Sequence, residues 1–247
     1  IEAPYALCPW QPESDPADVA RVASDAALQR ALLLYGVDRP GWAAREWKDA
    51  LSRFDDARRL EAIRQAREAG WYDRAVFYLG KDAPEELRFY ELRFPLDHAG
   101  VIRREAARHG LDPAWIAAQI RAESTFTPHA RSAADARGLM QVLPATGAAV
   151  ARRLGRAWRG AASLYEPETN IVLGTAYLDQ MLEKHGTPYQ AIAAYNAGPT
   201  PVARWNTERP DLPADLWIET ISYHETREYV PRVLAFSVLY DWRLDGQ

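Results

Sequence analysis

The chain has 247 residues, enough to bury the core of one large domain or of two domains of ordinary size. Hydrophobic residues make up 48% and charged residues 26% of the sequence, a composition typical of a folded globular protein that excludes a disordered one. The net charge of -4, with arginines interspersed among Asp and Glu, argues against a nucleic-acid-binding protein.

Cys8 is the only cysteine, which excludes an intrachain disulfide and any metal site built from several cysteines. No apolar run approaches the roughly 20 residues of a membrane span, so none is predicted. The first ten residues lack the basic and apolar regions of a signal peptide, and Leu7 fits poorly before a lipid-attachment cysteine. A mature form and a piece of a longer protein both remain open.

The first part of the chain, residues 16–94, has the pattern of consecutive short helices. Apolar residues recur at three- and four-residue steps over 19–33, and a C-terminal cap is expected at Gly36. Further helices are expected to end at Gly70 and Gly80. Because Gly36 and Gly70 lie 34 residues apart, the pattern fits a two-helix solenoid repeat, but an ordinary helical bundle explains it equally well.

Pro95 marks the expected domain boundary, because helices tend to end before proline. Residues 1–95 are predicted to form a helical hairpin or superhelical segment, and 96–247 a second domain. Between 124 and 143 the helical periodicity fails, so a loop or small sheet is expected there. The predicted fold class is mainly all-α, with at most a small β element. Helices of the second domain are expected at 101–109, 113–123, 145–154, 168–185, 188–196, about 214–221 and about 226–243.

Glu123 ends a helical pattern that begins with an Asp-Pro pair. On a helical wheel it continues the apolar face, while Arg121 falls on the other side. Loss of hydration and the negative end of the helix dipole both raise the pKa of such a carboxyl group, as a general acid needs. A structural salt bridge is the alternative. The other members of the face are Ile116, Gln119 and Ile120.

Four short motifs occur in order along some 110 residues: "AESTF" around Glu123 with "ARS" ending at Ser132, then "GLMQVLPAT" from Gly138, then "AAYNAGP", and then "ETREYV". Together they resemble the soluble lytic murein transglycosylases, family 23 of the glycoside hydrolases. "RFPL" at 93–96 resembles the junction between helical superhelix and catalytic domain in that family. The resemblance covers the second domain fully and the first 95 residues more loosely.

The resemblance implies a lysozyme-like helical domain in which Glu123 is the single catalytic acid/base. It implies cleavage of peptidoglycan glycan strands between N-acetylmuramic acid and N-acetylglucosamine, with a 1,6-anhydro product and without metal or cofactor. It also implies a location in the bacterial periplasm or envelope; protein partners are not predicted. Met140 and Phe126 are expected to shape the sugar-binding groove or the core beneath it. The residues expected to bind substrate are Ser132, Met140, Gln141, Tyr195, Asn196 and Glu225.

Several of these residues also have purely structural explanations. Ser132 fits a turn, and Gln141 fits a buried amide that pairs with backbone groups. Asn196 fits a helix C-terminal cap. Ser222 and Glu225 have the spacing of a capping box before the last helix, which explains Glu225 without any ligand.

The sequence departs from the family pattern at a few positions, of which Asp135 matters most. It stands where the family has glycine, and aspartate tolerates a left-handed backbone. Most glycosidases need two carboxylates, and Asp135 is the nearest candidate for the second. Its place in a loop indicates that it is incidental. A lysozyme-type hydrolase and a non-catalytic helical scaffold remain as alternatives. The other departures are Thr127, Thr200 and Pro201.

Overall fold

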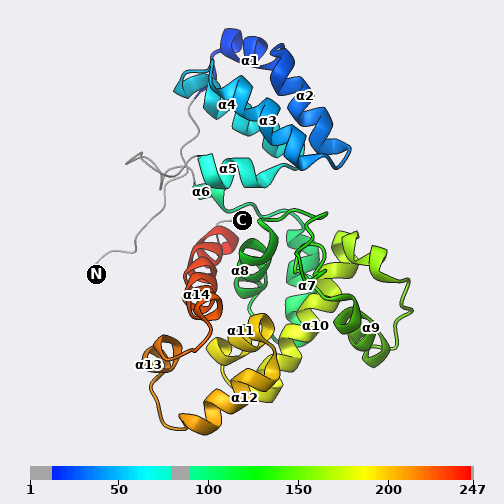
Figure 1. The fold of residues 1–247 in the computed structure, drawn as a ribbon, viewed down its shortest axis with the longest axis vertical. Helices are drawn as coiled ribbons and strands as arrows, with labels where there is room; N and C mark the ends of the chain where they lie inside the picture. The colour runs from blue at the N-terminus through cyan, green and yellow to red at the C-terminus, as the bar shows by residue number, and fades with distance from the viewer. Residues whose placement is uncertain (1–12, 79–89, 246–247) are drawn as a thin grey trace. The chain divides into compact units, whose positions relative to one another are not determined.

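The computed structural model describes residues 13–78 and 90–245, and the chain divides into two compact units, Ile1–Pro95 and Leu96–Gln247 (Figure 1). The described residues form α-helices and no β-strand, so the expected mainly α fold is confirmed. None of the described helices is long and apolar enough to cross a membrane. Cys8 and the helix end expected at Gly80 lie outside the described residues.

Aspartate residues begin three helices of the first unit. The side chains of Asp15, Asp25 and Asp55 accept hydrogen bonds of 2.8 to 3.0 Å from backbone N–H groups of the first turn. Such caps pair N–H groups that have no partner within the helix, and each stabilises the helix by about 1 kcal/mol. The helices described in this unit are α1 (Pro16–Ala23), α2 (Ala26–Gly36), α3 (Pro40–Leu51), α4 (Asp56–Glu68), α5 (Tyr72–Tyr78) and α6 (Tyr90–Arg93).

Trp71 lies in an aromatic cluster at the centre of this unit's core. Its ring stacks on Tyr35 with the centroids 4.7 Å apart and meets Trp47 edge-on at 5.4 Å. The Tyr35 hydroxyl donates a 3.2 Å hydrogen bond to the carbonyl oxygen of Gly70. The cluster therefore links α2 and α3 to the turn that follows α4.

Helix α2 ends at Gly36 as expected, but Gly36 is its last helical residue and the cap residue is Val37. The left-handed backbone of this turn falls on Asp38, with φ of 56°, which an aspartate tolerates better than most residues. Gly70 does adopt a left-handed conformation, with φ of 76°, directly after Ala69, the C-cap residue of α4. The two turns of the expected 34-residue repeat are therefore built differently.

Helix α8 (Pro113–Ser124) is the central helix of the second unit. Every residue from Ala114 to Arg121 is buried, and the helix packs against α7 (Ala99–His109) and α14 (His224–Asp245) (Figure 1). Arg121, which falls on the opposite side of the helical wheel from the apolar face, is buried as well, and its guanidinium carbon lies 4.9 Å from the ring centroid of Phe236 in α14. The remaining elements are α9 (Pro144–Arg153), the 3-10 turn η2 (Ala161–Tyr165), α10 (Pro167–His185), α11 (Pro188–Ala197), α12 (Pro199–Glu208) and α13 (Ala214–Glu219).

Helix α12 is absent from the expected elements. It follows α11 with only Gly198 between them, and Pro199 and Pro201 both fall in its first turn. Proline is tolerated there because the first N–H groups of a helix have no helical partner. Val202 and Trp205 are fully buried and attach the helix to the core. Two prolines that suggest a break in the sequence therefore start a helix.

Residues 125–143 form an irregular loop in which Arg137 makes two isolated β-bridges, to Arg131 and to Val142. Phe126 is fully buried, with its ring 6.1 Å from that of Tyr240, so it belongs to the core beneath the loop. Non-glycine residues with a left-handed backbone are concentrated here, which indicates a specifically shaped loop. They are Thr125, Phe126, Asp135 and Gln141, with φ of 54°, 60°, 66° and 47°.

Candidate active site

Glu123 lies in the last turn of α8 and is partly buried. Burial is the largest influence on its carboxyl group and raises the pKa to about 7. The charge of Glu225 raises the pKa further, whereas a hydrogen bond from Tyr229 and the charge of Arg232 lower it. A carboxyl group with this pKa is protonated in a large fraction of molecules at neutral pH, as a general acid must be.

The Tyr229 hydroxyl donates a short hydrogen bond to Oε1 of Glu123, and its own oxygen accepts a 2.7 Å bond from Nε2 of Gln119. Gln119 lies one turn before Glu123 on α8, and Tyr229 comes from α14. The expected alternative, an ion pair between Glu123 and an arginine, does not occur in the described part of the chain. Tyr229 was not among the expected site residues, although it lies in the "ETREYV" motif one turn after Glu225.

Asn170 fixes the loop from within the core. It is fully buried in α10, and its Oδ1 accepts a 2.7 Å bond from the N–H of Met140. Its Nδ2 donates to the carbonyl oxygens of Arg137, at 2.8 Å, and Leu164, at 2.7 Å. Gly138 has φ of 75°, and a Cβ there would lie 2.1 Å from the Leu164 carbonyl oxygen. This close approach requires glycine.

Met140 and Gln141 occupy different positions in the loop. The Met140 side chain is fully buried and packs against Gly174, so it lies in the core beneath the site and not at the surface. Gln141 is partly exposed, and its Nε2 donates to the carbonyl oxygens of Ala130 at 3.1 Å and Gly138 at 2.8 Å. The amide therefore fixes the loop backbone, while its Oε1 is left for other donors.

The two serines near Glu123 both stabilise the loop. Ser124 donates a 2.7 Å bond from Oγ to the carbonyl oxygen of Leu139, so the residue after the acid ties α8 to the loop. Ser132 is exposed, and its Oγ accepts a 3.1 Å bond from the N–H of Ala136. Ser132 therefore stabilises a turn, which agrees with the structural explanation of this residue. Its exposed hydroxyl is also accessible to a ligand.

Asp135 is held by two arginines. Its Oδ1 accepts from Nε of Arg131 at 2.6 Å and from Nε of Arg137 at 3.0 Å, and its Oδ2 accepts from Nη2 of Arg137 at 3.0 Å. The hydrogen bond from Arg137 is the main cause that holds the pKa of this carboxyl group below its usual value. A carboxylate in this state is a poor proton donor, and it spans the turn of the loop.

Tyr195 connects α11 to the loop. Its hydroxyl donates a 2.8 Å hydrogen bond to the carbonyl oxygen of Met140, and its ring lies 5.2 Å from that of Tyr177. Burial and the nearby charge of Glu123 raise the pKa of Tyr195 well above its ordinary value, so the hydroxyl stays neutral. Tyr195 therefore lies beside Glu123 as a neutral, fixed aromatic group.

Asn196 and Glu225 meet at the junction of α11 and α14. Asn196 donates from Nδ2 to Oε1 of Glu225 at 3.4 Å and accepts from the Thr226 hydroxyl at 2.6 Å. The C-terminal cap expected at Asn196 is wrong, because α11 continues to Ala197. The capping box expected between Ser222 and Glu225 is wrong, because α14 begins at His224 and Ser222 therefore lies one residue too early to be its N-cap.

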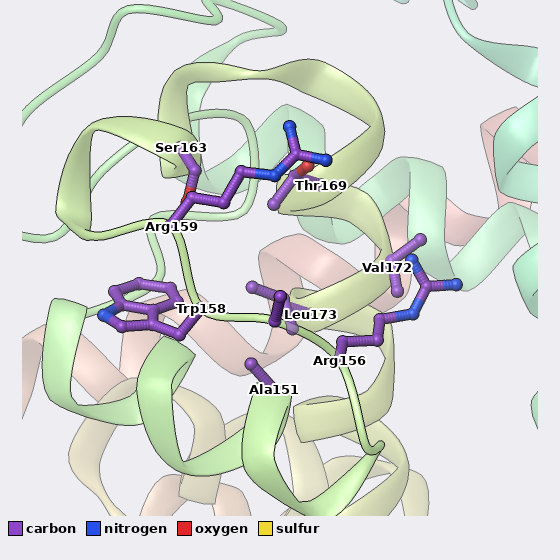
Figure 2. Close-up of a pocket in the computed structure, with 9 residues that line it drawn as sticks. Ala151, Arg156, Trp158, Arg159, Ser163, Thr169, Val172 and Leu173 are labelled. Carbon is purple, nitrogen blue, oxygen red and sulfur yellow. The ribbon is translucent and has the colours of Figure 1, made fainter.

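No group of three or more His, Cys, Asp or Glu residues that could hold a metal ion occurs in the described ranges 13–78 and 90–245. A separate cavity of about 200 Å³ lies between α9, η2 and α10. Figure 2 shows Arg156, Trp158 and Arg159 around it, with Leu173 among them. None of its lining residues belongs to the Glu123 cluster, so this cavity is not part of the candidate active site.

The described residues define a helical, lysozyme-like fold in which Glu123, a carboxyl group of raised pKa, lies at the end of a buried helix. Two family models match the sequence: the transglycosylase SLT domain over residues 100–218, and the soluble lytic murein transglycosylase L domain over residues 21–81. The chain belongs to the soluble lytic murein transglycosylase family. The SLT match ends before Glu225 and Tyr229.

Similar proteins come from several bacteria. The chain is 31% identical over 209 residues to a putative soluble lytic murein transglycosylase of Haemophilus influenzae, covering 84% of the chain and 35% of that protein. It is 31% identical over 217 residues to the soluble lytic murein transglycosylase of Salmonella typhimurium, covering 87% and 33%. The chain thus spans about a third of the length of these curated relatives.

Two solved structures are similar along almost the whole chain. The structure of an inactive Glu-to-Gln mutant of the lytic transglycosylase Slt from Pseudomonas aeruginosa is 35% identical, with a TM-score of 0.82, covering 98% of this chain and 39% of that one. The 70-kDa soluble lytic transglycosylase from Escherichia coli is 27% identical, with a TM-score of 0.78, covering 94% and 38%.

Proposed function

We propose that the chain is a peptidoglycan lytic transglycosylase in which Glu123 is the single general acid and base. The observation that carries this proposal is the Glu123 carboxyl group, which burial holds at a pKa of about 7 while Tyr229 fixes one of its oxygens. The proposed substrate is the glycan strand, cut between N-acetylmuramic acid and N-acetylglucosamine.

The reaction needs one protein carboxyl group and no water. Glu123 gives its proton to the glycosidic oxygen, the bond from that oxygen to the anomeric carbon breaks, and the N-acetylglucosamine leaves with the new hydroxyl. The N-acetyl group of the muramoyl sugar stabilises the developing cation, a recognised exception to the two-carboxylate rule. Ionised Glu123 then takes the proton of the sugar's 6-hydroxyl, whose oxygen bonds to the anomeric carbon and closes the 1,6-anhydro ring. The carboxyl group is thereby returned to its protonated state.

The nearby carboxylates support a single-acid mechanism. Asp135 is engaged by Arg131 and Arg137, so it is not poised to activate a water molecule. Glu225 is exposed in the first turn of α14 and is bound by Asn196. We assign Glu225 to the edge of the glycan site, where it also helps to keep Glu123 protonated by charge repulsion.

The other expected residues are proposed to bind or position the glycan in different ways. Exposed Ser132 and the Gln141 amide oxygen, which accepts no hydrogen bond from the described residues, are available as direct polar contacts. Tyr195 and Asn196 position the loop and Glu225 through their hydrogen bonds, as fixed groups that orient a bound sugar. Met140 supports the site from the core, through its backbone carbonyl.

The names of the relatives support the proposed substrate. The Salmonella protein is named for its action on murein, and a solved 70-kDa soluble lytic transglycosylase is in complex with bulgecin A. We propose that residues 96–247 form the catalytic domain and residues 1–95 a helical superhelical segment, acting on cell-wall glycan in the bacterial periplasm. A lysozyme-type hydrolase is the second candidate, because it would use the same acid on the same bond.

Digestion of purified peptidoglycan tests whether the chain is catalytic. The unmodified chain should solubilise it, and Glu123→Gln should lower the rate at least about 100-fold, since general acid catalysis contributes about 10² to 10⁴. Glu228→Gln is a matched control, because Glu228 is exposed on the same α14 and its carboxylate lies 3.4 Å from the exposed His224 ring, away from Glu123 in the hydrogen-bond pattern of the described residues. Equal digestion by the unmodified and Glu123→Gln chains would remove Glu123 from the mechanism, and digestion by neither would favour a non-catalytic scaffold.

A further inference from the structure

Gln119 is completely buried, although one polar atom of its side chain has no partner. Its Nε2 donates to Tyr229, while its Oε1 is buried without a hydrogen bond in the described residues. A buried acceptor without a partner costs about 1 to 3 kcal/mol. An apolar side chain of similar length would fill this space without that cost, so packing alone does not account for a glutamine here.

The effect of Gln119 is to fix the direction of a hydrogen-bond chain. A tyrosine hydroxyl has a single hydrogen. Because the Gln119 amide donates to the Tyr229 oxygen, that hydrogen must be directed to another acceptor, and the acceptor within reach is Oε1 of Glu123. The hydrogen-bond chain therefore runs in one direction, from Gln119 through Tyr229 to Glu123.

We infer that Gln119 and Tyr229 are positioning residues that reserve Oε1 of Glu123 as a permanent acceptor, so that the reactive proton is carried by Oε2. In the protonated acid, Oε1 accepts from Tyr229 as a carbonyl oxygen, which leaves Oε2 as the hydroxyl. In the ionised form the same bond is retained and strengthened, since charge-assisted hydrogen bonds are stronger than neutral ones. This inference rests on the proposed function only for the role of the proton, because the hydrogen-bond chain exists without substrate.

The opposite orientation of the Gln119 amide would reverse the direction of the hydrogen-bond chain. Oε1 of Gln119 would then accept the Tyr229 hydrogen, and Glu123 would have to donate its own proton to Tyr229. The two orientations differ in what removal of the Gln119 amide does to Glu123. In the inferred orientation the amide strengthens the bond from Tyr229 to the carboxylate, whereas in the opposite one it withdraws the hydrogen from Glu123.

Carbon-13 NMR titration of the Glu123 carboxyl group in the full chain tests this, with the resonance identified by its absence in Glu123→Gln. Gln119→Met keeps the shape of the side chain but has no amide, and it should raise the pKa of Glu123 by about 0.3 to 0.5 unit. Tyr229→Phe should raise it by about one unit, because the carboxylate loses its donor. The other groups that act on Glu123, namely Tyr195, Glu225 and Arg232, are unchanged in both variants.

If Gln119→Met lowers the pKa of Glu123 or leaves it unchanged while Tyr229→Phe raises it, the inferred direction of the hydrogen-bond chain is overturned. If neither variant changes the pKa of Glu123, the hydrogen bonds from Gln119 to Tyr229 and from Tyr229 to Glu123 do not act on this carboxyl group, and the inference fails entirely. Gln180→Leu, on α10 and outside this cluster, is the control and should leave the Glu123 titration unchanged. The alkaline limb of kcat/KM on peptidoglycan should move with the NMR values. If the NMR shifts occur but the chain cleaves no glycan, the proposed function fails while the positioning role stands.

Discussion

Asp135 and Arg137 form a two-pronged ion pair, in which both carboxylate oxygens accept guanidinium hydrogen bonds of 3.0 Å. Asp135 has a left-handed backbone with φ of 66°, and Arg131 adds a third bond at 2.6 Å. The only carboxylate in the loop after Glu123 is thus used to hold the loop's turn. In a glycosidase with two catalytic carboxylates, the second would be free to act on water or the sugar.

Replacement of Asp135 should therefore leave the chemistry largely intact. Asp135→Asn tolerates the left-handed backbone and keeps one acceptor oxygen, so we expect kcat/KM on purified glycan to stay within about threefold of the unmodified chain. Steady-state digestion rates measure this. A loss as large as that of Glu123→Gln would show that Asp135 takes part in catalysis.

Ionisation of Glu123 should make the folded state less stable as the pH rises. Its pKa is raised from 4.5 to about 7, so between these values the folded state holds a proton that the unfolded state has lost. The free energy of unfolding then falls with increasing pH across this window, by about 3 kcal/mol at most for this group. Glu123→Gln cannot ionise and should escape the loss.

Urea denaturation at pH 5 and pH 8 measures this effect. The free energy of unfolding of Glu123→Gln, measured relative to that of the unmodified chain, should be higher at pH 8 than at pH 5. For the control Glu228→Gln, at an exposed site, this difference should be the same at both pH values. An identical stability difference between Glu123→Gln and the unmodified chain at both pH values would mean that burial does not raise the pKa of Glu123.

Gly138, the single glycine of the loop at 125–143, should tolerate no side chain. A Cβ at this position would lie 2.1 Å from the backbone oxygen of Leu164 and 2.3 Å from Nδ2 of Asn170, so Gly138→Ala must displace the loop. We expect a loss of about 3 kcal/mol or more in the free energy of unfolding. Gly155→Ala is the matched control, because Gly155 is also left-handed but has open space around it, and it should cost about 1 kcal/mol. Equal losses would mean that strain of the backbone, and not the contact, decides the cost.

The Tyr195 hydroxyl should contribute to the stability of the loop through Met140. Tyr195→Phe leaves the Met140 carbonyl oxygen without its 2.8 Å donor and should cost about 1 kcal/mol in thermal or urea unfolding. Tyr177→Phe alters the adjacent ring, whose hydroxyl has no hydrogen bond in the described structure, and should cost less. If both substitutions are neutral, the contact between Tyr195 and Met140 does not hold the loop.

Local sequence signals predict the helices of the second unit well where capping and apolar periodicity agree, as at α8 and α10. They fail at α12, because Pro199 and Pro201 indicate a break unless the preceding helix end is known to lie at Ala197. The helical wheel also fails to predict that Arg121 is buried, since its guanidinium packs on Phe236, which lies 115 positions later in the chain. Tertiary partners of this kind are not contained in a local pattern.

The sequence predicts the acidic residue of the candidate site, but not the residues that form hydrogen bonds around it. The apolar face and the motif around Glu123 indicate a buried carboxyl group, and the structure places it in that environment. The donor Tyr229 and its neighbour Gln119 come together only because α14 packs against α8. Asn170 has no sequence signal for its role, because its three hydrogen bonds go to backbone atoms of two other segments.

Mass spectrometry of the fragments released from peptidoglycan tests the central claim most directly. If Glu123 acts alone and the sugar's 6-hydroxyl is the nucleophile, the muramoyl ends will be 1,6-anhydro, lighter by one water than hydrolysed ends, and digestion in ¹⁸O-labelled water will leave them unlabelled. Hydrated, ¹⁸O-labelled muramoyl ends as the sole product would contradict the account and identify the chain as a hydrolase.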